Sequence, residues 1–408
     1  MSGRRTQASV HYDVAIVGGG MVGGALACAL GGSALKVALI EPHPPRPPAG
    51  EDFEQRVSAL TLASQALLEN VGAWAGILAR RAAEVRAMRV WDAWGEIHFD
   101  AAEIGEPYLA HIVENAVVVA ALHERLQQHT NVHVVHDRVA GFALEEDAAT
   151  LALADGRRLR ARLAVGADGA DSAVRRALGI PVRRLDMRQL GIVATVRTEG
   201  AHRDTAWQRF LPTGPLAFLP LPEAHACSIV WSADRERAEE LLALDDAAFL
   251  AALAEAFGDR LGRLRSVGPR AAFPLALAHA DSYVRPRVAL VGDAAHVVHP
   301  LAGQGVNLGL LDAAALAEVL FDAADARRDL GGLHVLRRYE RWRKGDNLAM
   351  VAVTGGFRYL FGNDWPLLRS ARGLGLSLTD RLGPVKWLIM RRASGLDGDL
   401  PRLARRGL

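Results

Sequence analysis

Cysteine is scarce in this sequence, and long uninterrupted apolar runs are missing from it. The 408 residues include two cysteines, Cys28 and Cys227, which are too few for a disulfide framework or a thiolate metal site and are typical of a reducing compartment. No uncharged apolar run approaches the ~20 residues that span a bilayer, and no apolar targeting region follows Arg4 and Arg5. We therefore expect a cytoplasmic protein that binds no metal, with a peripheral position on the inner membrane left open.

An excess of charge of one sign is also missing. The formal net charge is +2, which is too small to predict a nucleic-acid partner. Hydrophobic residues make up 50% of the sequence, a composition that excludes a disordered or fibrous chain. The length predicts two or three structural units with a substantial core.

A glycine-rich turn near the start of the chain is the first motif with a chemical meaning. Residues 12–17 predict a strand, Gly18, Gly20 and Gly23 form a GxGxxG pattern, and a helix of small residues follows. Such a turn lets a pyrophosphate approach the backbone and the helix N-terminus. Glu41, at the end of the next predicted strand, is placed to accept hydrogen bonds from ribose hydroxyls. The pattern predicts a dinucleotide site but does not decide between FAD and NAD, and an ordinary tight turn is the alternative.

Two further motifs follow predicted strands later in the chain. Residues 166–175 read GADGADSAVR, residues 291–296 read VGDAAH, and residues 300–307 read PLAGQGVN. In this order after the glycine loop, they resemble the single-component flavin aromatic hydroxylases that share the para-hydroxybenzoate hydroxylase fold. The resemblance implies that the dinucleotide is FAD and that the protein is a monooxygenase with NADH or NADPH as a transient reductant.

The resemblance also implies individual cofactor contacts. Asp293 would hold hydroxyls of the ribityl chain, and the helix at Asn307 would turn its N-terminus toward the flavin pyrimidine edge, where negative charge develops on reduction. Arg56, expected at the start of a helix, would reach the cofactor, and Asp168 would contact both the flavin and the nicotinamide nucleotide. The expected contacts are Gly18, Gly20, Met21, Val22, Gly23, Glu41, Arg56, Asp168, Gly169, Asp293, Pro300, Gly303, Gln304, Gly305, Val306 and Asn307.

Structural explanations compete with several of these roles. A simple turn would also account for Asp168, with Asp171 as a helix N-cap, and Arg56 could be a surface residue. His296 and His299 are expected to be structural histidines rather than catalytic ones.

Further segments narrow the resemblance to the ubiquinone-biosynthesis hydroxylases, which act on a polyprenylated phenol or quinol. These segments include residues 56–60, 88–92, 111–115, 214–221 and 338–344. Within that group the sequence is most similar to the 2-polyprenylphenol hydroxylase branch, with the methoxy-benzoquinol hydroxylases next. Ala116, Val118, Val119 and Met187 depart from the family pattern, which leaves the hydroxylated ring carbon open.

The implied reaction uses O₂ through a flavin C4a-hydroperoxide in a dry, apolar pocket. A phenol also needs a proton acceptor, which the sequence does not identify; His111 is a candidate, although a core histidine is favoured. The alternatives are a flavoprotein hydroxylase or reductase of the same fold that acts on another aromatic or isoprenoid substrate, a halogenase on that scaffold, an NAD-dependent dehydrogenase, and a non-catalytic flavin-bound component of a quinone-biosynthesis complex.

The predicted elements indicate an α/β fold. We expect a discontinuous Rossmann-like FAD-binding domain, an inserted mixed or antiparallel β-sheet substrate domain and a helical C-terminal segment. The FAD-binding domain is expected over residues 1–73, 109–182 and 275–335, the sheet domain over 74–108 and 183–274, and the C-terminal segment over 336–408. Residues 58–71 are expected to be helical. Residues 387–392 predict either contact with a membrane surface or a helix packed on the FAD-binding domain.

Overall fold

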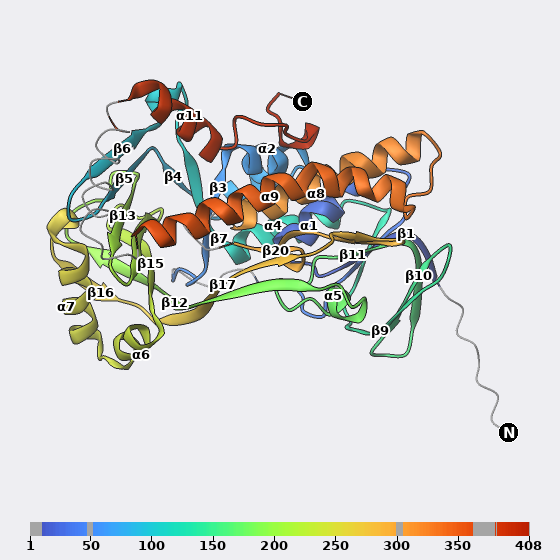
Figure 1. The fold of residues 1–408 in the computed structure, drawn as a ribbon, viewed down its shortest axis with the longest axis horizontal. Coiled ribbons are helices and arrows are strands. Elements are labelled where there is room, and N and C mark those ends of the chain that lie inside the picture. Colours follow the sequence, from blue (N-terminus) through green and yellow to red (C-terminus); the bar gives the residue numbers. More distant parts are fainter. Residues whose placement is uncertain (1–9, 47–51, 299–304, 362–379, 381, 408) are drawn as a thin grey trace.

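The computed structural model describes residues 10–46, 52–298, 305–361, 380 and 382–407. Two large sheets, a small third sheet and a set of covering helices make up this part of the chain (Figure 1).

The first large sheet has eight strands around a parallel centre. Its main path runs β18, β19, β11, β1, β2, β8, and β10 and β9 extend it antiparallel from β11. The residues of β1 from Val14 to Val17 are buried, as expected for a parallel strand with both faces covered. The strands are β1 (Val10–Val17), β2 (Val37–Ile40), β8 (Val132–Val135), β9 (Val139–Leu144), β10 (Ala149–Leu153), β11 (Arg158–Gly166), β18 (Val284–Arg285) and β19 (Val288–Leu290).

Helices rich in small residues cover this sheet. Helix α1 (Met21–Leu30) packs against α8 (Gly305–Asp325) and α4 (Asn115–Leu126). Most alanines on α1 and α8 are buried, which lets these helix backbones approach closely. The long helix α9 (Leu333–Phe361) packs along α8 (Figure 1).

The second large sheet has nine strands and is antiparallel except where β13 runs parallel to β5. Its order is β20, β17, β12, β15, β14, β13, β5, β6, and β16 pairs with β12. The strands are β5 (Ala87–Trp91), β6 (Glu96–Asp100), β12 (Val182–Thr198), β13 (Thr205–Leu211), β14 (Gly214–Pro220), β15 (Ala226–Asp234), β16 (Leu264–Val267), β17 (Ala271–Ala280) and β20 (His296–Val297).

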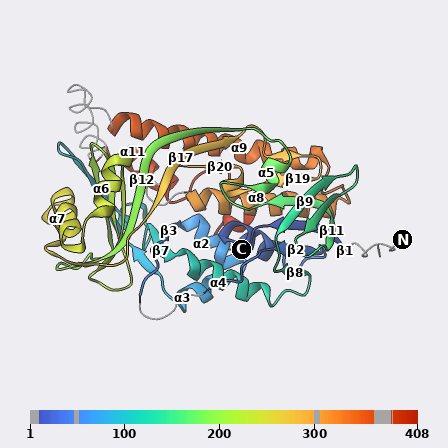
Figure 2. The ribbon, with the colours of Figure 1, turned by 90° about the horizontal axis from the view of Figure 1, so that it is seen from below.

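Two helices close one side of the second sheet through an aromatic cluster. Phe249 and Phe257 of α7 (Asp246–Phe257) are buried beside α6 (Arg235–Ala243), and the ring of Phe257 stacks on that of Phe218 in β14. The long strands β12 and β17 run from this sheet toward the nucleotide-binding side (Figure 2). β17 spans the domain boundary that we predicted near residue 275, and β12 begins at Val182, at the boundary that we predicted near residue 183.

A small third sheet corrects one sequence prediction. The helix expected over residues 58–71 begins only at α2 (Leu62–Asn70), because the preceding residues form β3 (Val57–Thr61). β3 pairs with β7 (Ala110–Glu114), which in turn pairs with β4 (Ala83–Val85). Arg56 therefore precedes a strand and not a helix. The tertiary pairing with β7 overrides the helical pattern.

The remaining elements are short except for one C-terminal helix. Helix α11 (Gly383–Ala393) packs on η1 (Ala101–Ile104), next to β6, within the range expected for the sheet domain and not for the FAD-binding domain. The others are α3 (Trp74–Leu78), α5 (Ala173–Ala177), η2 (Asp259–Leu261), η3 (Gly292–Ala294) and η5 (Arg402–Ala404). No helix in the described ranges is long and apolar enough to cross a membrane.

Candidate functional site

The three glycines of the predicted loop have different surroundings. Gly18 has a φ of +104°, and a Cβ added there would lie 2.4 Å from the carbonyl oxygen of Ala167. A Cβ at Gly23 would lie 1.9 Å from the carbonyl oxygen of Gly18. At Gly20, just before α1, a Cβ would meet nothing within 4 Å. Gly18 and Gly23 thus allow close packing, and Gly20 leaves open space at the N-terminus of α1.

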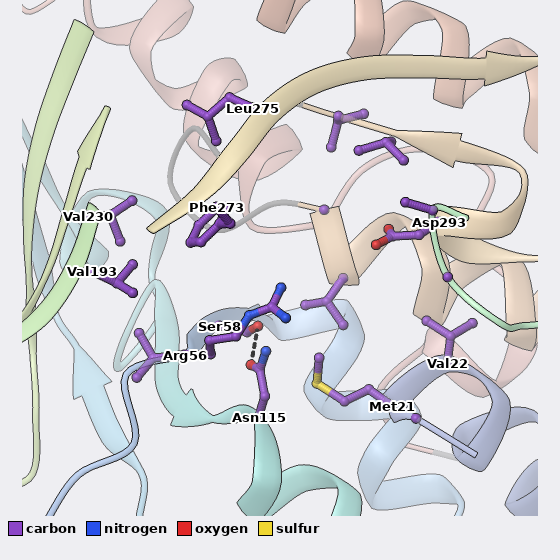
Figure 3. Close-up of a pocket in the computed structure, with 18 of the residues that line it drawn as sticks. Met21, Val22, Arg56, Ser58, Asn115, Val193, Val230, Phe273, Leu275 and Asp293 are labelled. Atoms are coloured by element: carbon purple, nitrogen blue, oxygen red, sulfur yellow. Dashed lines mark hydrogen bonds between the residues drawn. The ribbon is translucent and has the colours of Figure 1, made fainter. Parts of the chain in front are cut away.

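That open space belongs to a cavity of about 410 Å³ between the two large sheets (Figure 3). One side of it is formed by the glycine loop, by the turn after β11 and by the start of α8. The other side is formed by apolar residues of the nine-stranded sheet, including Val193, Leu219, Val230, Phe273 and Leu275. A cavity of this size and lining is typical of a small-molecule site.

Two charged side chains face each other across the cavity. Arg56 and Asp293 point into it from opposite sides (Figure 3). The guanidinium carbon of Arg56 lies 5.6 Å from the centroid of the Phe273 ring. Asp293 is accessible from the cavity, but the surrounding protein raises the pKa of its carboxyl by desolvation, an effect that His296 and Arg56 oppose. A carboxyl at this position can accept hydrogen bonds from a polyhydroxylated ligand.

A hydrogen-bonded pair adds polarity to the cavity wall. The hydroxyl of Ser58 donates to Asn115 Oδ1 at 2.7 Å, and both residues line the cavity. The backbone amide of Asn115, at the start of α4, donates to the backbone carbonyl oxygen of Arg56. This bond fixes the backbone that carries the Arg56 side chain.

Two of the predicted cofactor contacts, Glu41 and Asp168, do not line the cavity and instead accept hydrogen bonds from the loops around it. Glu41 accepts from the amide of Gly19 at 2.7 Å and from that of His43 at 3.0 Å, so it fixes the glycine loop. Asp168 accepts from the hydroxyl of Ser172 and from the first amides of α5. The N-cap of α5 is Ser172 and not Asp171, as our alternative had it.

The start of α8 meets the cavity through Gly305 and Val306. Asn307 lies deeper and ties α8 to the third sheet. Its side chain donates to the carbonyl oxygen of Ala59 at 2.8 Å and accepts from the amide of Thr61 and the hydroxyl of Ser64. The predicted contacts Pro300, Gly303 and Gln304, together with His299, lie outside the described residues.

A buried ionic network beneath the site was missed by the sequence reasoning. Asp312 of α8 accepts from the amide of Gly292, lies 2.5 Å from His296 Nε2 and accepts from Arg343 Nε at 3.0 Å. The side-chain amide of Asn347 also donates to Asp312 Oδ1, at 3.1 Å. Burial raises the pKa of Asp312, but His296 and Arg343 outweigh burial and hold the pKa below its ordinary value. His296 is thus part of a structural network, in line with the structural role favoured for it.

His111, the candidate base, lies on β7 and is buried away from the cavity lining. Its ring packs edge-on against Trp74 and Tyr108. Desolvation lowers its pKa to about 4, with Glu84 opposing the shift. The surroundings are those of a core histidine.

The described residues fit the cofactor expected from the sequence. The open space at Gly20 meets the amides at the start of α1, where a pyrophosphate is stabilised. Asp293 offers an acceptor farther along the same cavity, and the start of α8 lies beyond it. No group of three His, Cys, Asp or Glu side chains suited to a metal ion occurs within the part of the chain that the structure covers.

Comparison with known proteins identifies close relatives along nearly the whole chain. The family described as FAD binding domain matches residues 11–351. Ubiquinone hydroxylase UbiL of Rhodospirillum rubrum is 41% identical over 96% of this chain and 92% of its own length. The 3-demethoxyubiquinol 3-hydroxylase of Escherichia coli is 40% identical over 94% of this chain and 98% of its own.

Solved structures share the fold. PqsL of Pseudomonas aeruginosa in complex with 2-aminobenzoylacetate is 26% identical, with a TM-score of 0.75 over 90% of this chain and 99% of its own. The p-nitrophenol 4-monooxygenase PnpA of Pseudomonas putida has a TM-score of 0.79 over 96% of this chain and 99% of its own. At 22% identity, the second likeness bears on the fold alone.

Proposed function

Because the chain belongs to the family of FAD-dependent ubiquinone-pathway hydroxylases, we propose that it hydroxylates the ring of a polyprenylated phenol or quinol with NADH or NADPH as reductant. The enzyme is an FAD-dependent monooxygenase. Its relatives named for ubiquinone hydroxylation support a quinone-type substrate. The branch within the family stays a prediction.

The cavity between the sheets is the observation that carries this proposal. It joins the open space at Gly20 to the apolar wall of the nine-stranded sheet. A ligand bound along the glycine loop and a flat apolar ring held against Phe273 would therefore meet in one cavity. An apolar wall of this kind excludes water from the site, and reactive intermediates are thereby protected from hydrolysis.

Bound FAD would supply the electron transfer and O₂ chemistry. The chain's own residues supply position and charge. The amides at Gly20 and Met21 would hold the pyrophosphate, Asp293 would accept hydrogen bonds from ribityl hydroxyls, and Arg56 would place a cation in the same cavity. The N-terminus of α8, at Gly305, would favour negative charge on the nearby ligand.

Enlarging Val230 tests where the aromatic substrate binds. Val230 lines the cavity from β15, so Val230→Phe should fill the substrate space and raise KM at least about tenfold, since a ring cannot enter an occupied pocket. FAD content should be unchanged, because Val230 lies on the sheet wall away from the glycine loop.

Leu185→Phe is the matched control. Leu185 is 59% exposed on β12 and does not line this cavity, so KM should be unchanged. Equal KM values for Val230→Phe and the wild type, in steady-state assays of hydroxylated product, would contradict a ring site at this wall. Loss of FAD from Val230→Phe alone would place the cofactor there instead.

A further inference from the structure

Helix α11 turns its apolar side chains outward. Val385, Trp387, Leu388 and Ile389 are each between 44% and 56% exposed, whereas Lys386, the lysine of this helix, is 6% exposed. A surface helix of a globular protein normally has the opposite arrangement, with its apolar stripe toward the core. An exposed apolar patch of this kind marks an interaction site.

The buried face of α11 is held by charge. Lys386 Nζ lies 2.8 Å from Glu103 Oε1 in η1 and 3.1 Å from Asp380 Oδ1. Met390 is buried on the same side of the helix. Because these contacts fix the polar face inward, the apolar face is presented to the surroundings.

The charges around the apolar face favour an anionic partner. Four neighbouring carboxylates each form an ion pair: those of Glu103, Glu106, Asp380 and Asp397. Arg391 pairs with Asp397 and lies 4.7 Å from the centroid of the Trp387 ring. Arg392 is exposed and forms no ion pair with any residue that the structure describes. The charge left unpaired on α11 is therefore positive.

We propose that α11 docks the enzyme on an anionic bilayer surface. Leu388, Ile389 and Val385 enter the boundary between headgroups and acyl chains, and Arg392 lies beside anionic headgroups. The helix has 11 residues and is about 16 Å long. That is roughly half of a hydrocarbon core of ~30 Å, so the helix lies in the interface and does not cross it.

The position of α11 connects this surface to the site. Its partner η1 follows directly on β6, the edge strand of the nine-stranded sheet (Figure 1). Docking through α11 therefore brings the sheet that forms the apolar cavity wall to the membrane, ahead of the nucleotide-binding sheet. The link between membrane docking and the cavity rests on the proposed function, because a polyprenylated substrate would enter the cavity from the bilayer.

Vesicle flotation of the FAD-loaded full-length protein tests the proposal. The wild type should float with phosphatidylcholine vesicles that contain phosphatidylglycerol. The double variant Leu388→Glu/Ile389→Glu should lower the partition coefficient at least about tenfold, because two apolar side chains no longer enter the lipid. Arg392→Gln should lower it about fivefold on vesicles that contain phosphatidylglycerol and leave it unchanged on pure phosphatidylcholine.

The matched control is Leu78→Glu/Leu144→Glu, which places the same two charges on leucines that are 52% and 42% exposed elsewhere. It should float like the wild type. Flavin absorbance and the melting temperature check that each variant is folded. Val385→Asp, on the same face of α11, repeats the test if the double variant does not fold.

Three results would overturn the proposal. They are a wild type that binds neither kind of vesicle, equal flotation of the α11 variant and its control, and a dimer in sedimentation that the α11 variant alone converts to a monomer. The last would mean that a second copy of the chain covers α11. Flotation requires no turnover, so a protein that floats without hydroxylating its substrate would count against the proposed function alone.

Discussion

At the scale of single residues, we expect substitution of Gly20 to affect ligand binding and substitution of Gly23 to affect folding. A Cβ at Gly20 meets open space, whereas one at Gly23 meets the backbone of Gly18 at 1.9 Å. Gly20→Ala should therefore change the free energy of unfolding of the apoprotein by less than about 1 kcal/mol but weaken FAD binding at least about tenfold, because the methyl group occupies the phosphate space.

Gly23→Ala is the contrasting variant. It should lower the free energy of unfolding by about 3 kcal/mol, since backbone must move to admit the methyl group. Denaturant melts of the apoproteins and FAD titrations by fluorescence measure both quantities. A Gly20→Ala protein that keeps full FAD affinity would contradict a pyrophosphate site at this loop.

His111 makes stability depend on pH. The folded protein holds the pKa of His111 down to about 4, against an ordinary value of 6.5, so the unfolded chain takes up its proton first as the pH falls. The stability contributed by neutral His111 is complete above pH 6.5 and is lost progressively toward pH 4, by up to about 3 kcal/mol.

Denaturant melts between pH 7 and pH 4 measure this loss. In His111→Phe, which keeps a ring between Trp74 and Tyr108, the slope over this range should be smaller. Hydroxylation by this variant should continue at a comparable rate. A fall in rate of several orders of magnitude, with FAD content and stability intact, would restore His111 as the catalytic base.

The placement of residues at the cavity was predictable where it follows a local pattern. Gly20, Asp293, Gly305 and Val306 were expected from motifs, and they meet at one cavity. Asp312 was not expected as the centre of a network, because Arg343 and Asn347 lie 31 and 35 positions away. No short motif marks such pairs, and helix packing alone brings them together.

At the scale of elements, Asn307 joins α8 to the third sheet. Replacing it in Asn307→Ala would leave the amide of Thr61, the hydroxyl of Ser64 and the carbonyl of Ala59 without their buried partner. We expect a loss of about 2–4 kcal/mol in the free energy of unfolding and weaker FAD binding, because the start of α8 lines the cavity.

Asn70→Ala, on α2, is a suitable control for Asn307→Ala. Asn70 also donates to two backbone carbonyls, those of Leu403 and Arg405, but in a more exposed position. It should cost less stability and leave FAD affinity unchanged. Equal losses in the two variants, measured by thermal melts and FAD titration, would contradict a role for Asn307 in joining α8 to the site.

The strands and helices were predicted well where one local period dominates. The βαβ unit at residues 12–40 appears as expected. Residues 58–61 were assigned to a helix because their pattern continues into α2, and only pairing with β7 makes them a strand. Strand β12 is 17 residues long because its pairing with β17 extends as far as Val182, which no local pattern indicates.

At the scale of the whole molecule, the cavity lies between two large sheets that supply its two walls. The eight-stranded sheet carries the glycine loop, and the nine-stranded sheet carries the apolar wall. The sequence predicted an α/β fold with an inserted sheet. It could not predict that β17 continues across the boundary expected near residue 275, because strand pairing between distant segments leaves no local pattern.

Isotope labelling tests the central claim most directly. The FAD-loaded enzyme is supplied with NADH or NADPH, a short-tailed polyprenylated phenol and ¹⁸O₂, and the product is analysed by mass spectrometry. The account predicts a ring that gains a single labelled oxygen atom while one equivalent of reductant is consumed. Oxidation of the reductant to give only hydrogen peroxide and an unchanged ring, or a product oxygen that comes from water, would contradict it.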